Sequence, residues 1–150
     1  MDDPQVVLYN GKDPAPILGS FYAAEIRYVD AGGAQADASF TEMAAYLHPE
    51  VVLHQGPSVP FSGDWVGADG VERFFHVFSE TWLSLELSER HYYAGSAGVA
   101  ISQRMAATAR ATGRHVNTRV AHVIHFDNEL IRDWTVFYLD PATVTAAIRP

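Results

Sequence analysis

The spacing of apolar positions changes along the chain from a helical period to a strand period. In the first half, apolar residues recur every three or four positions in three separate segments, which predicts three amphipathic helices. The predicted helices cover residues 17–29, 39–47 and 70–79. A short strand is expected between the second and third of them, at residues 51–55. From residue 82 onward apolar and polar residues alternate, as at Leu83, Leu85 and Leu87, which predicts strands.

Turn-forming pairs divide the second half into long strands. Thr112-Gly113 and Asp127-Asn128 are the pairs typical of tight hairpins. The strands expected around them cover residues 99–111, 114–126 and 130–139, and a short helix at 141–148 closes the chain. Helices that precede a meander of antiparallel strands indicate an α+β fold, in which the helices cover one face of a curved sheet. Such a sheet forms a cone that encloses a pocket.

The two turns also predict which residues share a face of the sheet. With two-residue loops, Gln103 and Asp133 lie opposite His122 on the neighbouring strands. One face is then mainly apolar and lines the core or cavity. Its expected members are Ile101, Gln103, Met105, Val120, His122, Ile124, Ile131, Asp133, Thr135 and Phe137. The other face carries Arg104, Arg119, Arg132 and Trp134, and we expect it to meet water or a partner chain.

The expected opposition of His122 and Asp133 is the most chemically suggestive feature of this register. Directly opposed residues have Cβ atoms about 5 Å apart, close enough for a carboxylate to orient an imidazole ring and raise its pKa. We therefore predict a raised pKa for His122 and an acid/base role for the pair. The alternative is a buried pair that only fixes the strand register, and a slip of one residue would separate the two side chains.

Composition limits the classes of function. The 150 residues are 48% hydrophobic, and a formal net charge of −8 argues against nucleic acid or an anionic membrane surface as a partner. We expect one domain over residues 17–150, after an arm over residues 1–16 that contains three prolines. The first residues lack the pattern of a signal peptide, which favours a cytoplasmic location. The absence of cysteine excludes thiol chemistry, and the seven histidines show no metal-ligand spacing, so we expect neither a metal nor a cofactor.

Four segments resemble the SnoaL-like branch of the NTF2-like superfamily, which includes ketosteroid isomerases and polyketide cyclases. They are His48-Pro49-Glu50-Val51-Val52-Leu53-His54-Gln55, Gly63-Asp64-Trp65-Val66-Gly67, Ala111-Thr112-Gly113-Arg114 and Asp127-Asn128-Glu129-Leu130-Ile131-Arg132-Asp133-Trp134. The likeness spans about residues 17–145. It implies the NTF2-like cone, with three N-terminal helices packed on a curved and mainly antiparallel sheet around a pocket.

The resemblance also implies candidate site residues. Tyr28 falls on the tyrosine of ketosteroid isomerases, His122 on their oxyanion-hole acid and Gln55 on their general-base aspartate. Thr135 falls on the acid/base aspartate of the cyclases, and Asp133 lies two residues earlier on the same expected face. The pattern implies an enzyme without a cofactor that moves protons on a hydrophobic ketone or a polycyclic substrate. Isomerisation, cyclisation and dehydration are the candidate reactions.

In the resulting hypothesis His122, tuned by Asp133, is the acid/base, and Tyr28 and Gln103 hold the developing enolate oxygen. Gln55 orients the substrate, although strand alternation leaves open whether it or His54 faces the pocket. The other expected lining residues are Trp65, Met105, Thr135 and Phe137.

The alternative function is a binding or dimerisation domain without catalysis. A ligand site should enclose more than roughly 300 Å³. For either function we expect a homodimer that forms through the arginine-bearing face of the sheet.

Overall fold

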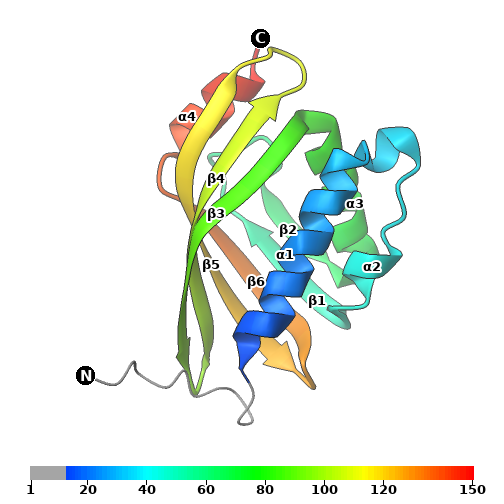
Figure 1. The fold of residues 1–150 in the computed structure, drawn as a ribbon, viewed down its shortest axis with the longest axis vertical. Coiled ribbons are helices and arrows are strands. Elements are labelled where there is room, and N and C mark those ends of the chain that lie inside the picture. Colours follow the sequence, from blue (N-terminus) through cyan, green and yellow to red (C-terminus); the bar gives the residue numbers. More distant parts are fainter. Residues whose placement is uncertain (1–12) are drawn as a thin grey trace.

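The computed structural model describes residues 13–150, which fold into a curved sheet with most of the helices on one side (Figure 1). The helices are α1 (Pro14–Asp30), the short 3₁₀ helix η2 (Gly33–Ala36), α2 (Thr41–Ala44), α3 (Gly67–Thr81) and α4 (Pro141–Ile148). The strands are β1 (Leu47–Gln55), β2 (Gly63–Val66), β3 (Trp82–Gly95), β4 (Gly98–Ala109), β5 (His115–Asp127) and β6 (Leu130–Tyr138). They form a six-stranded sheet in the order β2-β1-β6-β5-β4-β3, in which only the β1–β6 pair is parallel. The predicted α+β cone is confirmed.

Helix α1 begins and ends at residues whose chemistry favours those boundaries. The Asp13 carboxylate accepts a hydrogen bond from the Ala15 amide at 2.9 Å, and Pro14 occupies the first turn. After the last turn, Gly32 and Gly33 adopt φ values of 93° and 56°, which favour glycine. The predicted first helix is confirmed with three further residues at its start. Residues 1–12 of the predicted arm lie outside the described part of the chain.

The second predicted helix is wrong over much of its length. Only α2 is helical there, and β1 already begins at Leu47. Pro49 has no amide hydrogen to donate, and strand β1 tolerates it because the register between β1 and β6 shifts between Leu47 and Val52. The short strand β2, which pairs with the end of β1, lies in a segment for which the sequence pattern predicts neither a helix nor a strand.

The β4–β5 hairpin is wider than predicted, but its faces are as expected. The Ala109 amide donates to the Arg114 carbonyl at 2.8 Å, so the loop covers residues 110–113 instead of Thr112-Gly113 alone. Gln103 therefore lies opposite Val120, and His122 opposite Ile101. A shift of two residues keeps every side chain on its predicted face because strand side chains alternate.

The β5–β6 hairpin overturns the predicted inner face of β6. Its turn is Asn128-Glu129, with φ values of 49° and 66°, and Asp127 pairs with Leu130. His125 pairs with Asp133 whereas Phe126 pairs with Ile131, so Arg132 is the extra residue of a β-bulge.

The turn shifts the register by two residues and the bulge adds one, so the two faces of β6 are exchanged from Asp133 onward, whereas Ile131 is buried as predicted. Val136 lies opposite His122, and Trp134 is buried in the core. Asp133 lies on the outer face, so its predicted opposition to His122 is wrong.

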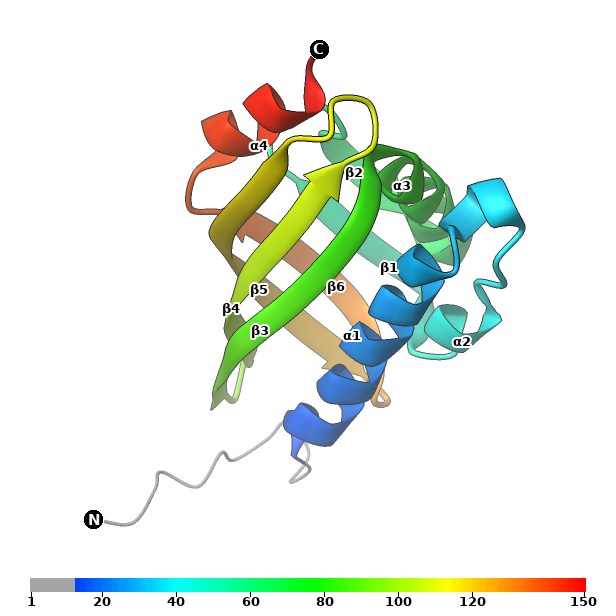
Figure 2. The ribbon, with the colours of Figure 1, turned by 45° about the horizontal axis from the view of Figure 1, so that its top comes forward.

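Aromatic side chains fill the space between the helices and the inner face of the sheet. Trp134 packs edge-on against Phe21 of α1 at 5.2 Å between ring centroids, and lies 6.2 Å from Phe75 of α3. Figure 2 shows α1 and α3 on the same side of the sheet, with α4 at the far end. Within residues 13–150, no helix has the length and apolarity needed to span a membrane.

Candidate functional site

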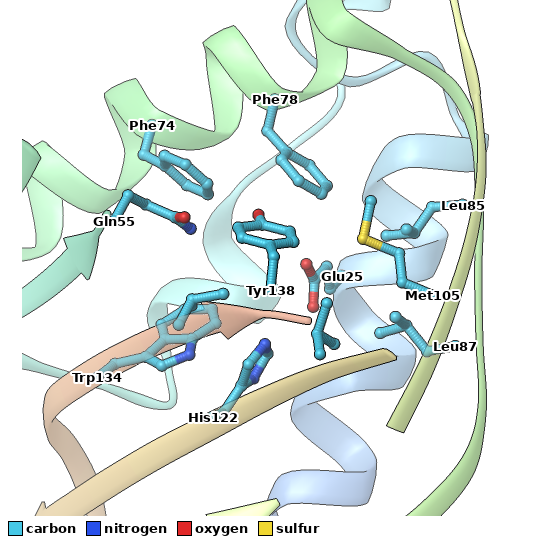
Figure 3. Close-up of a pocket in the computed structure, with 12 residues that line it drawn as sticks. Glu25, Gln55, Phe74, Phe78, Leu85, Leu87, Met105, His122, Trp134 and Tyr138 are labelled. Atoms are coloured by element: carbon cyan, nitrogen blue, oxygen red, sulfur yellow. The ribbon is translucent and has the colours of Figure 1, made fainter. Parts of the chain in front are cut away.

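A small cavity lies between α1, α3 and the inner face of the sheet (Figure 3). Its volume is about 30 Å³, enough for about two water molecules. This volume is far below that expected from the sequence for a ligand site. The lining consists of Glu25, Gln55, Phe74, Phe78, Leu85, Leu87, Met105, Val120, His122, Trp134, Val136 and Tyr138.

Glu25 places a carboxyl group in this largely apolar lining. The residue lies on the buried face of α1 and is 5% exposed. Burial raises the pKa of Glu25 to about 8, and the positive charge of Arg90 opposes that rise. The Oε2 atom has no hydrogen-bond partner among the described residues. At neutral pH the group is therefore mainly an uncharged acid that can donate a proton inside the pocket.

Glu25 is not among the site residues predicted from the sequence, although its position on the first helix carries a signal. By helical spacing Glu25 lies on the same face of the first helix as Leu18, Phe21 and Tyr22, which are buried. An acid on the apolar face of a helix is buried, and a buried carboxyl is protonated or paired.

His122 faces the pocket as predicted, but its partner is Tyr22. The Nδ1 atom of His122 lies 2.7 Å from the Tyr22 hydroxyl oxygen. Burial, assisted by the charge of Arg90, lowers the pKa of His122 to about 3, so the ring is neutral. The predicted rise of this pKa is wrong because the Asp133 carboxylate lies on the other face of the sheet. Burial also holds the pKa of Tyr22 well above its usual value, so its hydroxyl keeps its proton.

Gln55 and Tyr138 supply the other polar groups of the lining. Gln55 points inward at the end of β1, as the resemblance implied, and its Oε1 atom has no partner in the described part of the chain. Tyr138 lies on the outer face in the predicted register, but the exchange of faces in β6 turns its ring into the pocket. Burial raises its pKa, so the hydroxyl is a hydrogen-bond donor at neutral pH. Figure 3 shows both side chains with their polar ends toward the cavity.

Two of the other predicted residues lie close to the cavity. Met105 belongs to the lining. Gln103 is fully buried on β4, where its Oε1 atom accepts a hydrogen bond from Arg90 Nε at 2.9 Å. Gln103 therefore stands behind the lining and does not face the space itself.

Four predicted residues lie elsewhere. Tyr28 packs between Phe40 and Phe75, away from the lining. Trp65 donates from its indole nitrogen to the Phe61 carbonyl at 3.2 Å and does not line the cavity. The exchange of faces in β6 moves Thr135 and Phe137 to the outer face, where Phe137 is 54% exposed.

Asp133 does meet a histidine, but on the outer face of the sheet. His54 Nε2 lies 3.0 Å from Asp133 Oδ2, and His54 Nδ1 lies 2.7 Å from Asp64 Oδ1. The hydrogen bond with Asp133, followed by that with Asp64, raises the pKa of His54. These three outer residues join β6, β1 and β2 and are not part of the cavity. Across residues 13–150 no group of three or more His, Cys, Asp or Glu is arranged to hold a metal ion.

Comparison with known proteins agrees with this architecture. The model of the SnoaL-like domain matches residues 26–134, which is most of the chain. The chain belongs to the SnoaL-like family. A comparison with functionally curated proteins found no match.

Solved structures of other SnoaL-like and NTF2-like proteins share the fold. An NTF2-like protein from Burkholderia thailandensis is 26% identical, with a TM-score of 0.74 over 93% of this chain and 99% of that chain. A candidate SnoaL-like polyketide cyclase from Jannaschia sp. is 17% identical, with a TM-score of 0.62 over 93% of this chain and 99% of that chain. A candidate polyketide cyclase from Pseudomonas putida is 11% identical, with a TM-score of 0.66 over 86% of this chain and 96% of that chain.

Proposed function

We propose that this SnoaL-like protein is a cofactor-independent enzyme that transfers protons on a small, largely apolar carbonyl compound. The observation that carries the proposal is the uncharged, buried carboxyl group of Glu25, whose Oε2 atom has no partner in the described structure. A pKa of about 8 lies near a neutral working pH, where a group can both release and recover a proton. Isomerisation, cyclisation and dehydration of carbonyl compounds all need such a group.

The other polar groups of the lining have complementary roles in this proposal. The Gln55 amide and the Tyr138 hydroxyl are donors for the carbonyl oxygen, where negative charge develops as a neighbouring C–H bond breaks. Tyr22 holds the neutral His122 ring through Nδ1, which fixes the orientation of the ring in the lining. Glu25 thus replaces the His122–Asp133 pair of the sequence hypothesis as the proton-transfer group.

The size of the cavity favours a small substrate over a polycyclic one. The space of about 30 Å³ is roughly a tenth of an ordinary ligand pocket. Flexible or aromatic side chains such as Met105 and Phe78 border it, and these are the groups whose rotation would enlarge it. Because the surrounding side chains are mainly apolar, the proposed substrate is uncharged.

Deuterium exchange tests the proposal without knowledge of the natural substrate. The α-protons of cyclopentanone or 2-cyclohexenone are followed by NMR in D₂O with the wild-type protein and with Glu25→Gln. We expect exchange above the buffer rate, and loss of a general acid/base should reduce it by about 10²–10⁴-fold. Tyr28→Phe is the matched control, since Tyr28 lies away from the cavity. Exchange equal to that of buffer, or unaffected by Glu25→Gln, contradicts the proposal.

The second candidate is a domain that holds a ligand or forms a dimer without chemistry. The small volume of the cavity is the observation that favours it. In that case a small ketone would raise the melting temperature of the wild type and of Glu25→Gln alike, and neither protein would accelerate exchange.

A further inference from the structure

We propose that Arg90 is a positioning residue that controls proton release from Glu25, as the fixed positive charge that stabilises the ionised carboxylate. This inference rests on the proposed function and names a residue that the sequence hypothesis did not include. A carboxylate left in an apolar pocket after it gives up a proton is costly unless a positive charge acts on it. Arg90 packs over the ring of Tyr22, which lies one helical turn before Glu25 on the buried face of α1, so its positive charge acts on the Glu25 carboxyl.

A bulge in β3 turns Arg90 toward the interior. Ser88 pairs with Arg104 and His91 pairs with Ser102, so Glu89 and Arg90 together face the single residue Gln103. Glu89 adopts a φ of 50°, a backbone conformation that residues other than glycine rarely adopt. Its carboxylate is held on the outer face by Arg104 at 2.6 Å and Arg119 at 3.2 Å. With Glu89 held outside, Arg90 is directed inward.

Two neutral groups hold Arg90 in place. Its Nε atom donates to Gln103 Oε1 at 2.9 Å, and its guanidinium carbon lies 4.4 Å from the centroid of the Tyr22 ring. Tyr22 in turn contacts His122, so the arginine stands directly behind the polar part of the lining. Since an amide does not neutralise a guanidinium, the charge of Arg90 remains available to act on Glu25. A carboxylate at position 103 would cancel much of that charge at nearly the same volume.

The other ionisable groups around Glu25 do not supply a positive charge. Tyr22 on α1, Tyr92 on β3 and Tyr138 on β6 carry phenol groups, which are uncharged or negative. His122 on β5 is neutral because burial lowers its pKa to about 3. The members of the lining that come from α3 and β4 are Phe74, Phe78 and Met105, which do not ionise. The electrostatic control of Glu25 is therefore assigned to Arg90.

The test measures the ionisation of Glu25 directly. Side-chain carboxyl ¹³C NMR of selectively labelled glutamate, assigned by comparison with Glu25→Gln, gives the titration midpoint in the full chain. We expect Arg90→Gln and Gln103→Glu each to raise the midpoint by about one pH unit or more, because the first removes the charge and the second neutralises it. Arg90→Lys keeps the charge and should stay closer to the wild type. Arg73→Gln, which removes a charge from an exposed position on α3, is the matched control and should leave the midpoint unchanged.

Unchanged midpoints in both Arg90→Gln and Gln103→Glu overturn the inference. Gln103→Glu keeps the size of a buried side chain, so it provides the answer if Arg90→Gln does not fold. The pH profile of ketone exchange is the second measurement. The pH at which the exchange rate changes should shift together with the NMR midpoint. If the midpoint moves while Glu25→Gln leaves exchange unaffected, Arg90 controls Glu25 as proposed but the enzymatic function fails. The two failures are therefore distinguishable.

Discussion

The Tyr22 hydroxyl oxygen lies 2.7 Å from Nδ1 of His122, and both residues are buried. The bond joins the middle of α1 to β5, and only His122 of the two residues lines the cavity. Since Tyr22 keeps its proton, its hydroxyl can donate to Nδ1, which leaves the ring proton of His122 on Nε2. The orientation of His122 thus depends on a residue one hundred positions away in the sequence.

Removal of that hydroxyl should destabilise the protein and release the ring. Tyr22→Phe leaves a buried nitrogen without its partner, which costs about 1–3 kcal/mol in the free energy of unfolding. Urea denaturation measures this loss, and the ¹⁵N shifts of the His122 ring report the change of tautomer. Tyr93→Phe is the control, because Tyr93 is 64% exposed. Equal losses in the two variants, with unaltered ring shifts, would show that the Tyr22–His122 bond is not formed in solution.

Glu25 should make the folded protein less stable as the pH rises. The unfolded chain releases this proton near pH 4.5, whereas the folded chain keeps it up to about pH 8. Between those values the folded state binds more protons, so the free energy of unfolding falls with pH, by up to about 1.4 kcal/mol per pH unit from this one group. Above pH 8 the loss is complete.

Glu25→Gln removes that ionisation, so it should stabilise the protein more at pH 8 than at pH 5. Urea denaturation of both proteins at the two pH values measures the difference, with Glu80→Gln as an exposed control on α3. If the free energies of unfolding of the wild type and the variant change by the same amount with pH, Glu25 ionises normally in the folded protein.

The His54–Asp133 contact should give a second, separate pH dependence. The pKa of His54 is raised in the folded protein, so its stabilising contribution is fully present below the unfolded value near 6.5 and is lost as the pH rises through the folded value. Asp133→Asn should lower the pKa of His54, as NMR titration of the ring would measure. Asp30→Asn, an exposed change at the end of α1, is the control. A His54 pKa that is the same in wild type and Asp133→Asn contradicts the contact.

The outer face of the sheet is the surface that we expect to form a homodimer. Phe137 and Leu139 are 54% and 76% exposed there, close to Arg119 and Ser102. Sedimentation analysis should give a dimer for the wild type and a monomer for Phe137→Asp. Leu83→Asp is the matched control, because Leu83 is equally exposed but lies at the start of β3. A monomeric wild type would refute this expectation, and a dimer that survives Phe137→Asp would place the interface elsewhere.

Local pattern was sufficient to predict most of the fold. The apolar stripe of α1, the alternation of the strands and the helix at 141–148 are all present, because burial of a repeated apolar face needs only the helix or strand period. The inward positions of β4 and β5 are also as predicted despite the wider hairpin, since a shift of two residues preserves the alternation. Gln55, Met105 and His122 consequently line the pocket.

The inner face of β6 could not be derived from the same pattern. The turn at Asn128-Glu129 shifts the register by two residues, and the bulge at Arg132 adds the one residue that exchanges Asp133, Thr135 and Phe137 for Trp134, Val136 and Tyr138.

The sequence by itself determined the α+β class and the order of the long helices and strands. Only the tertiary structure decided which polar groups meet. Trp134 is buried against Phe21 and Phe75, which belong to helices far away in the sequence, and its burial requires the bulge that sends Asp133 outward to His54. Strand register depends on such long-range packing, because a shift by an odd number of residues costs little locally but moves every side chain to the opposite face.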